Sequence, residues 1–180
     1  SANPITKPSK SYTVTYNYNG NGQGNTVVTS NCSFDGYYTS TNGGGTQYIG
    51  SNGYLTSNAN NKYFSSSGTL YAKWGSNSAI TLLNPTWAGY TFTGWYDTSG
   101  NLIGKGGASY TPKANITLVA HWSLATYTIT YNLNGGSSSG NPSTYNMKSP
   151  DIKINTATKS GVDFLGWTGS SDLSSGLDGY

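Results

Sequence analysis

Two short segments of this chain each occur twice, and segments that recur in a fixed order indicate a chain built from repeated structural units. The segment TLYAKW ends at Trp74, and TLVAHW ends at Trp122. Outside this pair, YTVTYNYNG begins at Tyr12 and YTITYNLNGG begins at Tyr127. The repetition predicts small modules joined in series, each with a core of its own.

A third segment recurs at a constant shift. The stretch AITLLNPTWAGYTFTGW aligns without gaps on DIKINTATKSGVDFLGW, 72 residues later, and seven positions have the same or a similar residue. Both copies end in a Phe-x-Gly-Trp motif, whose tryptophans are Trp95 and Trp167. The earlier stretch CSFDGYY has a shortened form of the motif, with Tyr37 in the place of the tryptophan. Three units are therefore expected.

The motifs set the expected boundaries of these units. We expect a linker over residues 1–11, a first repeat over 12–74, a second over 75–122 and a third over 123–180. The second repeat lacks the Tyr-Thr-(Val/Ile)-Thr-Tyr strand, and the third ends before a closing Leu-x-Ala-x-Trp strand. The Gly-rich stretches between the aromatic and closing strands are expected to be loops.

The composition favours strands and turns over helices. Gly, Ser, Thr and Asn together make up 95 of the 180 residues, and 16 Tyr and 5 Trp accompany them. Such residues are middling to poor helix formers, whereas Tyr, Trp and Thr suit a pleated, half-buried surface. In the first repeat, strict alternation predicts that Tyr12, Val14, Tyr16 and Tyr18 share one face of a strand. The Asn-Gly that follows predicts a tight hairpin turn.

Charge and cysteine content exclude several classes of protein. The chain has nine Lys, six Asp and no Arg or Glu, so its net charge of +3 is too weak for a nucleic-acid surface. A single cysteine excludes an intramolecular disulfide framework. No segment approaches the length of a transmembrane helix, and the first ten residues contain no apolar signal-peptide core. We expect a mature or excised segment whose signal or anchor lies elsewhere.

The three motifs, in this order, resemble the Listeria-Bacteroides repeat, also known as the internalin B B-repeat. The resemblance covers nearly all of residues 12–180. It implies a mainly β fold made of small β-grasp, ubiquitin-like α+β modules with little helix, strung in an extended tandem array. It also implies a secreted or wall-anchored bacterial surface protein, located outside the cell. The family has no catalytic motif, so the resemblance supplies no active-site residue.

Residues with catalytic chemistry are few and scattered. His121 is the only histidine and takes the position that Lys73 has in the earlier copy, which indicates a solvated strand position. Asp97 and Asp163 are the carboxylates that a glycosidase could use, but turn or surface roles are favoured for both. Cys32 is expected to be a small, buried apolar residue. We therefore predict no enzyme activity, no metal and no cofactor.

Aromatic side chains are the candidates for ligand contact: Trp87, Trp95, Tyr96 and Trp167. Because a tryptophan recurs in each Phe-x-Gly-Trp motif, packing is favoured over exposure for Trp95 and Trp167. Strand alternation places Phe92 and Trp95 on opposite faces, unless Gly94 introduces a bulge. Trp87 is the strongest single candidate for ligand contact, because the matching residue in the third repeat is Lys159.

Two functions from different classes fit these features. The first is an adhesin stalk or spacer with weak contacts to a host or bacterial surface protein or to a glycan. The alternative is a carbohydrate-binding module that stacks sugar rings on exposed Trp or Tyr side chains. The sequence identifies no partner.

Overall fold

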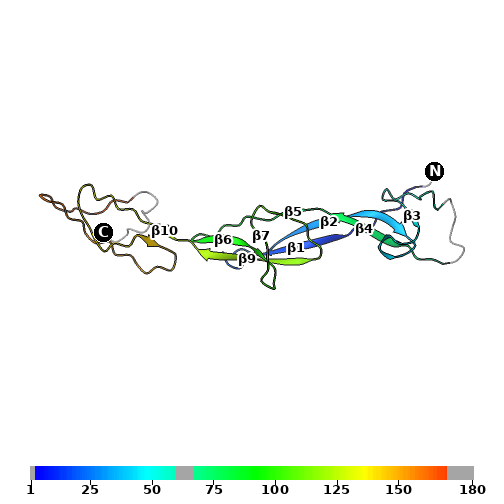
Figure 1. Ribbon diagram of the computed structural model, residues 1–180, viewed down its shortest axis with the longest axis horizontal. Helices are drawn as coiled ribbons and strands as arrows, with labels where there is room; N and C mark the ends of the chain where they lie inside the picture. The colour runs from blue at the N-terminus through cyan, green and yellow to red at the C-terminus, as the bar shows by residue number, and fades with distance from the viewer. Residues whose placement is uncertain (1–2, 60–66, 170–180) are drawn as a thin grey trace. The chain divides into compact units, whose positions relative to one another are not determined.

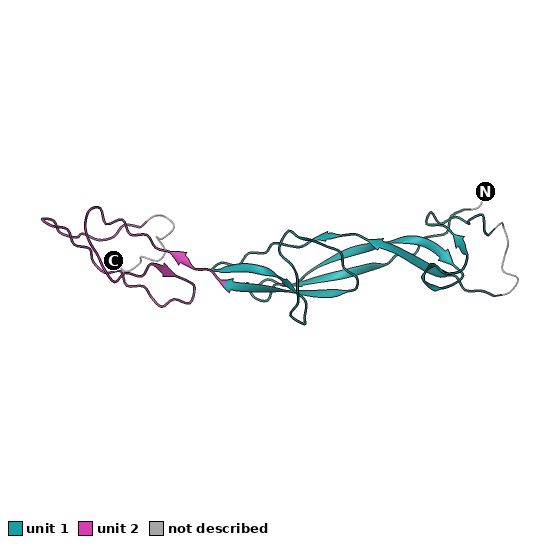
Figure 2. Ribbon diagram, viewed as in Figure 1, with its two compact units in different colours: residues 1–123 teal, residues 124–180 magenta. Residues whose placement is uncertain are grey.

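A computed structural model describes residues 3–59 and 67–169. The chain divides into two compact units, residues 1–123 (unit 1) and 124–180 (unit 2) (Figures 1 and 2). The fold is mainly β, as the composition predicted. In the described part of the chain, the one helix is the short 3-10 turn η1 (Thr41–Gly43). No helix among these residues is long and apolar enough to cross a membrane.

Unit 1 contains a seven-stranded sheet with the order β3-β2-β1-β9-β6-β7, in which β4 also pairs with β2. A separate two-stranded sheet joins β5 to β8. The strands are β1 (Ser11–Asn17), β2 (Thr26–Tyr38), β3 (Gln47–Ile49), β4 (Tyr71–Asn77), β5 (Ile80–Thr81), β6 (Tyr90–Tyr96), β7 (Leu102–Gly104), β8 (Ser109–Tyr110) and β9 (Ile116–Leu124).

Strand β1 joins the first and second sequence repeats in one sheet. It pairs antiparallel with the first half of β2 and parallel with β9, where Val14 lies opposite Ile116 and Tyr16 opposite Leu118. The stretch 75–122, which has no first strand of its own, thus shares a sheet with the first strand of the stretch 12–74. The three sequence boundaries stay a prediction about repeats; the structure places the first two repeats within one compact unit.

The second half of β2 belongs to a smaller group of strands. Residues from Cys32 to Tyr38 pair with β4, with register shifts on both sides of Phe34, and with β3 at Tyr37 and Tyr38. The chain thus forms β3 and β4 beside the second half of β2, adds β5 of the separate two-stranded sheet, and reaches the strands next to β1 only with β6 and β9 (Figure 1). The segment from Cys32 to Asn77 is an insertion between β1 and the strands that complete its sheet.

The core of unit 1 lies where β1, β6 and β9 meet. The predicted alternation in β1 is confirmed, because Val14 and Tyr16 are fully buried and Tyr18 is 4% exposed. The other residues of this core are Leu82, Trp95, Leu118 and Ala120.

Unit 2 has far less regular strand. Its one sheet among the described residues consists of β10 (Tyr127–Thr128) and β11 (Thr144–Tyr145). The prediction of a strand over the whole of Tyr-Thr-Ile-Thr-Tyr was therefore too long, since regular pairing includes only its first two residues. The physical reason is the number of partners: β1 pairs on both of its edges, whereas β10 pairs, among the residues that the structure describes, only with β11. The finer β-grasp assignment stays a prediction.

Candidate functional site

The aromatic motif Phe-x-Gly-Trp/Tyr forms the same local structure three times. Its glycines, Gly36, Gly94 and Gly166, have φ angles of 115°, 148° and 134°. These positive values are readily adopted only by glycine. In each copy the phenylalanine and the aromatic residue three positions later meet edge to face, with ring centroids 5.2, 5.2 and 5.4 Å apart.

This geometry corrects the expectation of opposite faces for Phe92 and Trp95. The pairing of β6 with β7 shifts register between Trp95 and Tyr96, next to Gly94. A β-bulge of this kind re-aims the side chains that follow it. Both rings therefore pack into one core, with Phe92 half-buried against the fully buried Trp95.

Trp95 is 0% exposed and is the centre of the core. Its ring lies edge-on to Tyr16 at 4.7 Å and to Tyr18 at 5.8 Å. Its indole N–H donates a 2.8 Å hydrogen bond to the backbone oxygen of Leu83. A buried indole with its N–H satisfied is in a packing role, and its ring offers no surface to a ligand in this structure.

Trp167 has the equivalent neighbours in unit 2, but its side chain is less buried than that of Trp95. Its indole N–H donates to the backbone oxygen of Asn155 at 3.1 Å, and its ring lies edge-on to Tyr131 at 5.5 Å. Asn155 follows Leu83 by the same 72 residues that separate the two tryptophans. Trp167 is half-buried, so it keeps some surface in contact with solvent.

Trp87 covers the turn that follows β1. Its ring stacks on Tyr90 at 3.8 Å with an interplanar angle of 14°, and its edge meets Trp122 at 5.6 Å. A Cβ atom added to Gly20 would lie 2.6 Å from the Trp87 ring. One side of the half-buried ring is therefore used for packing, and ligand contact by Trp87 stays a prediction.

The residue that replaces Trp87 in unit 2 covers the equivalent turn. The Lys159 ammonium donates to the backbone oxygen of Asn134 at 3.0 Å and lies near Gly135. The same position thus protects an Asn-Gly turn in both units, once through an aromatic ring and once through a hydrogen bond.

Tyr96 and His121 form a contact that sequence reasoning missed. Their rings stack at 3.8 Å with an interplanar angle of 12° on the neighbouring strands β6 and β9, where Tyr96 is half-buried and His121 is exposed. In the insertion, the Lys73 ammonium lies 5.9 Å from the centre of the Tyr38 ring. The signal shared by these two contacts is the tyrosine that directly follows the Phe-x-Gly-aromatic motif in its first two copies. The prediction that His121 is solvent-exposed is confirmed.

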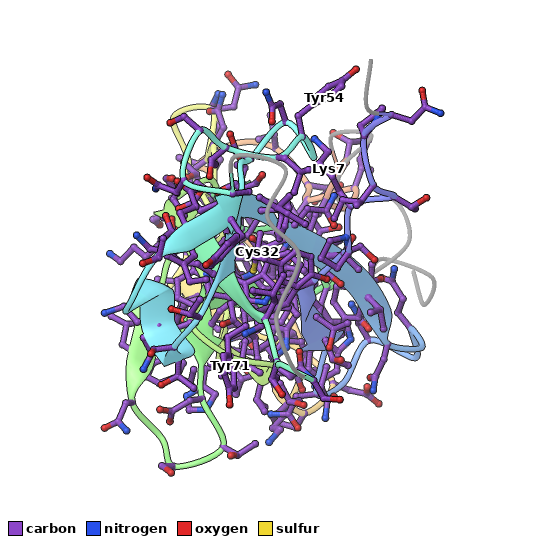
Figure 3. The ribbon with its side chains drawn as sticks, turned by 90° about the vertical axis from the view of Figure 1, so that its right-hand side faces the viewer. Lys7, Cys32, Tyr54 and Tyr71 are labelled. Carbon is purple, nitrogen blue, oxygen red and sulfur yellow. The ribbon has the colours of Figure 1, made fainter. Side chains whose placement is uncertain are left out.

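Of the other titratable candidates, Asp97 accepts hydrogen bonds within its own turn and Cys32 is a free thiol. The Asp97 carboxylate accepts hydrogen bonds from the backbone and side-chain amides of Asn101 and from the backbone N–H of Ser99. These bonds, those from Asn101 first, lower the pKa of Asp97. Cys32 is a half-buried free thiol on β2 (Figure 3). Within residues 3–59 and 67–169, no group of three His, Cys, Asp or Glu could hold a metal ion.

Unit 2 contains an open hollow of about 800 Å³. Its lining residues are 129–134, 136, 154, 157–159 and 162–169, and they include Tyr131, Phe164 and Trp167. Phe164 is 38% exposed and Leu165 is 97% exposed. The hollow is therefore lined in part by exposed apolar side chains.

The predicted ligand-contact residues do not form one site. Trp87 and Trp95 both belong to the aromatic cluster of unit 1, where Phe92 contacts Trp95 and Trp122. Tyr96 packs separately against His121, and Trp167 lies in unit 2.

A comparison with known proteins finds a repeat family in this chain. The family model described as the Listeria-Bacteroides repeat domain matches residues 62–121 and 127–178, more than half of the chain. Internalin H of Listeria monocytogenes serovar 1/2a is 32% identical over 84 residues, which are 46% of this chain and 15% of that protein. The chain thus spans a small part of this relative. No solved structure is significantly similar to the chain.

Proposed function

Since the chain belongs to the Listeria-Bacteroides repeat family, we propose that it is a spacer segment of a bacterial surface protein. In this role, the repeats hold a more distal binding domain away from the cell and make weak contacts of their own. The proposed location is extracellular, on the cell surface or the cell wall.

The observation that carries this proposal is the threefold aromatic motif. Each copy pairs a phenylalanine with the aromatic residue after a positive-φ glycine, at nearly the same centroid distance. A core that recurs along one chain is typical of repeat proteins, whose units contact mainly their neighbours. Repeating a small core extends a chain without requiring one large core.

The surface chemistry also supports a spacer. Only 8% of the residues are charged, so the polar surface offers little attraction to charged polymers. Two of the groups that could do acid-base chemistry have local partners: Asp97 is bonded to its own turn and His121 is stacked on Tyr96. Nothing in this arrangement favours catalysis.

Small-angle X-ray scattering of the purified chain over a concentration series tests the proposal. We expect an extended profile that does not change with concentration. A single compact domain of this length would have a radius of gyration of roughly 16 Å. A value near that figure, or one that grows with concentration, would contradict the spacer role.

The carbohydrate-binding alternative has less support. Trp95 is buried and Trp87 is stacked on Tyr90, so two of its proposed platforms already pack against protein. Exposed aromatic rings exist elsewhere, such as Tyr54, which is 43% exposed and points away from the ribbon in Figure 3. A glycan array probed with the chain and with Trp87→Ala tests this alternative; binding lost in the variant would favour it.

A further inference from the structure

Asparagine followed by glycine is the dipeptide that most readily loses its side-chain amide without an enzyme. The glycine nitrogen, which no side chain hinders, can attack the side-chain carbonyl carbon of the asparagine. This chain has five such dipeptides, which begin at Asn19, Asn21, Asn42, Asn52 and Asn134. We propose that Asn134 is a self-modification site, at which the Lys159 ammonium promotes conversion to aspartate and isoaspartate. This chemistry is separate from the spacer role and does not depend on it.

The reaction needs only water and hydroxide from the solvent. Hydroxide first removes the N–H proton of Gly135, and the nitrogen forms a bond to Cγ of Asn134. The bond from Cγ to Nδ2 breaks, and Nδ2 takes a proton from water and leaves as ammonia, so that a succinimide ring remains. Water then adds to one of the two ring carbonyl carbons and breaks the bond from that carbon to the ring nitrogen. No group is oxidised or reduced.

Lys159 lies where its charge stabilises the first step. Its ammonium donates a 3.0 Å hydrogen bond to the backbone oxygen of Asn134. This oxygen belongs to the peptide group of the Gly135 nitrogen, so it takes up negative charge when that nitrogen loses its proton. A donor already in place at an atom where negative charge develops stabilises the transition state more than the ground state. The contact that covers the turn therefore also activates it.

The turn does not use the attacking nitrogen to hold its shape. Its closing hydrogen bond runs from the N–H of Gly136 to the backbone oxygen of Leu133, at 2.8 Å. In the loop at Asn52, by contrast, the N–H of Gly53 itself makes such a bond, to the backbone oxygen of Gly50 at 2.9 Å. The nucleophile is thus engaged in that loop, which makes it a poorer site.

The other three asparagines have the same backbone conformation as Asn134. All four have left-handed φ angles, between 46° and 56°. The rotation that brings the glycine nitrogen to Cγ therefore starts from the same region in each. At Asn19 the residue that covers the turn is Trp87, whose uncharged ring lies against Gly20. The covering side chain there supplies no positive charge.

Asn42 is the internal control, because a lysine lies near it but points elsewhere. The Lys73 side chain runs against Gly43, and its ammonium lies 5.9 Å from the centre of the Tyr38 ring. Among the described residues, Asn134 is the one asparagine of the Asn-Gly dipeptides whose backbone oxygen accepts a hydrogen bond from a lysine. A comparison of the two sites separates a nearby lysine from a lysine bonded to the reacting peptide.

The natural chain should lose the amide of Asn134 faster than that of Asn42. The full chain is incubated at mildly alkaline pH, and peptide mapping by mass spectrometry follows each Asn-Gly site over time. Labelling of the same peptides by an isoaspartate methyltransferase identifies the rearranged product. Because Lys159 is exposed to solvent, we expect a rate difference of about fivefold, smaller than that of a donor in a buried enzyme site.

Two variants test whether the charge of Lys159 acts. Lys159→Met removes the charge and should slow the loss at Asn134 about fivefold, with Asn42 unchanged. Lys159→Arg keeps a cation and should restore most of the rate. A purely structural role predicts the opposite sign for Lys159→Met, because a turn without its cover moves more freely and reacts faster. Unchanged circular dichroism and tryptophan fluorescence check that both variants fold.

Denaturant supplies the second control. In concentrated urea the contact from Lys159 is lost, so the natural chain and Lys159→Met should lose the Asn134 amide at the same rate. An unchanged or faster rate at Asn134 in folded Lys159→Met would overturn the proposal. Loss at Asn134 that is no faster than at Asn42 in the natural chain would overturn it as well.

Discussion

At the scale of the residue, the position that covers the Asn-Gly turn has a different side chain in each unit. In unit 1 the Trp87 ring lies against Gly20, whose φ of 139° already restricts the position to glycine. In unit 2 the equivalent Lys159 reaches the backbone of its own turn. The tryptophan therefore packs against a local partner, and the ligand contact that its absence from one repeat suggested stays a prediction.

The contact between Trp87 and Gly20 can be tested by a double-mutant cycle. We expect Trp87→Ala to lower the free energy of unfolding by about 2 kcal/mol, since it removes a half-buried stacked ring. Gly20→Ala should be destabilising in the natural chain and less so in the Trp87→Ala chain, where the clash is relieved. Chemical denaturation of all four chains measures this coupling.

Gly22→Ala is the matched control for that cycle. Gly22 has a φ of 68°, but an added Cβ would meet nothing within 4 Å. Its substitution should introduce backbone strain alone, equally in both backgrounds. Strictly additive effects of Trp87→Ala and Gly20→Ala would show that the ring does not restrict the turn.

At the scale of the element, the hairpin of β6 and β7 depends on a carboxylate in its turn. The Asp97 side chain accepts from Ser99 and Asn101, and the backbone N–H of Asp97 donates to the oxygen of Asn101 at 2.9 Å. Hydrogen bonds of this kind favour the ionised form and fix the turn at the same time.

This carboxylate gives the hairpin a predictable pH dependence. Because the pKa of Asp97 is lower in the folded chain, its stabilisation is complete above the unfolded pKa and is lost as the pH falls through the folded value. We expect the melting temperature to fall between about pH 5 and pH 2, and to fall less in Asp97→Asn. Calorimetry over this range is the measurement. An identical pH profile for the two chains would contradict this role.

At the scale of the whole molecule, the insertion separates β1 from the strands that it completes. The first strands are 115 residues apart, whereas the aromatic strands are 72 residues apart, so unit 1 has 43 more residues between these two motifs than unit 2. Despite this distance, β1 pairs with β9 and covers Leu118 and Trp95. Unit 1 therefore depends on a contact between residues far apart in the sequence.

Removing β1 should consequently unfold the aromatic core of unit 1. A chain that lacks residues 1–20 loses Val14, Tyr16 and Tyr18, and Trp95 would be left exposed to water. We expect loss of the near-ultraviolet circular dichroism signal of the core and red-shifted tryptophan fluorescence. Removing residues 124–180 is the control, and unfolding of residues 1–123 should then stay close to that of the intact chain. A native-like spectrum without β1 would show that β9 needs no partner there.

The sequence by itself determined the mainly β class, the repeat motifs and the alternation of β1. These properties depend on local rules: period-two patterning, poor helix formers and Asn-Gly turns recur wherever the motif recurs. The exposed position of His121 could also be predicted, because its counterpart is a lysine. Local similarity is enough for such properties.

Only the tertiary structure decided which strands pair and which rings share a core. The pairing of β1 with β9 crosses the insertion, and no local pattern states which of two similar closing motifs a first strand will join. Phe92 and Trp95 share one core because the backbone at Gly94 departs from that of a regular strand. The alternation of residues in the sequence does not predict this departure. The hollow of unit 2 likewise depends on how separate stretches of the chain lie around the motif, which the motif's own sequence does not specify. Pairing and burial are properties of neighbours distant in sequence, so they are fixed only when the chain folds.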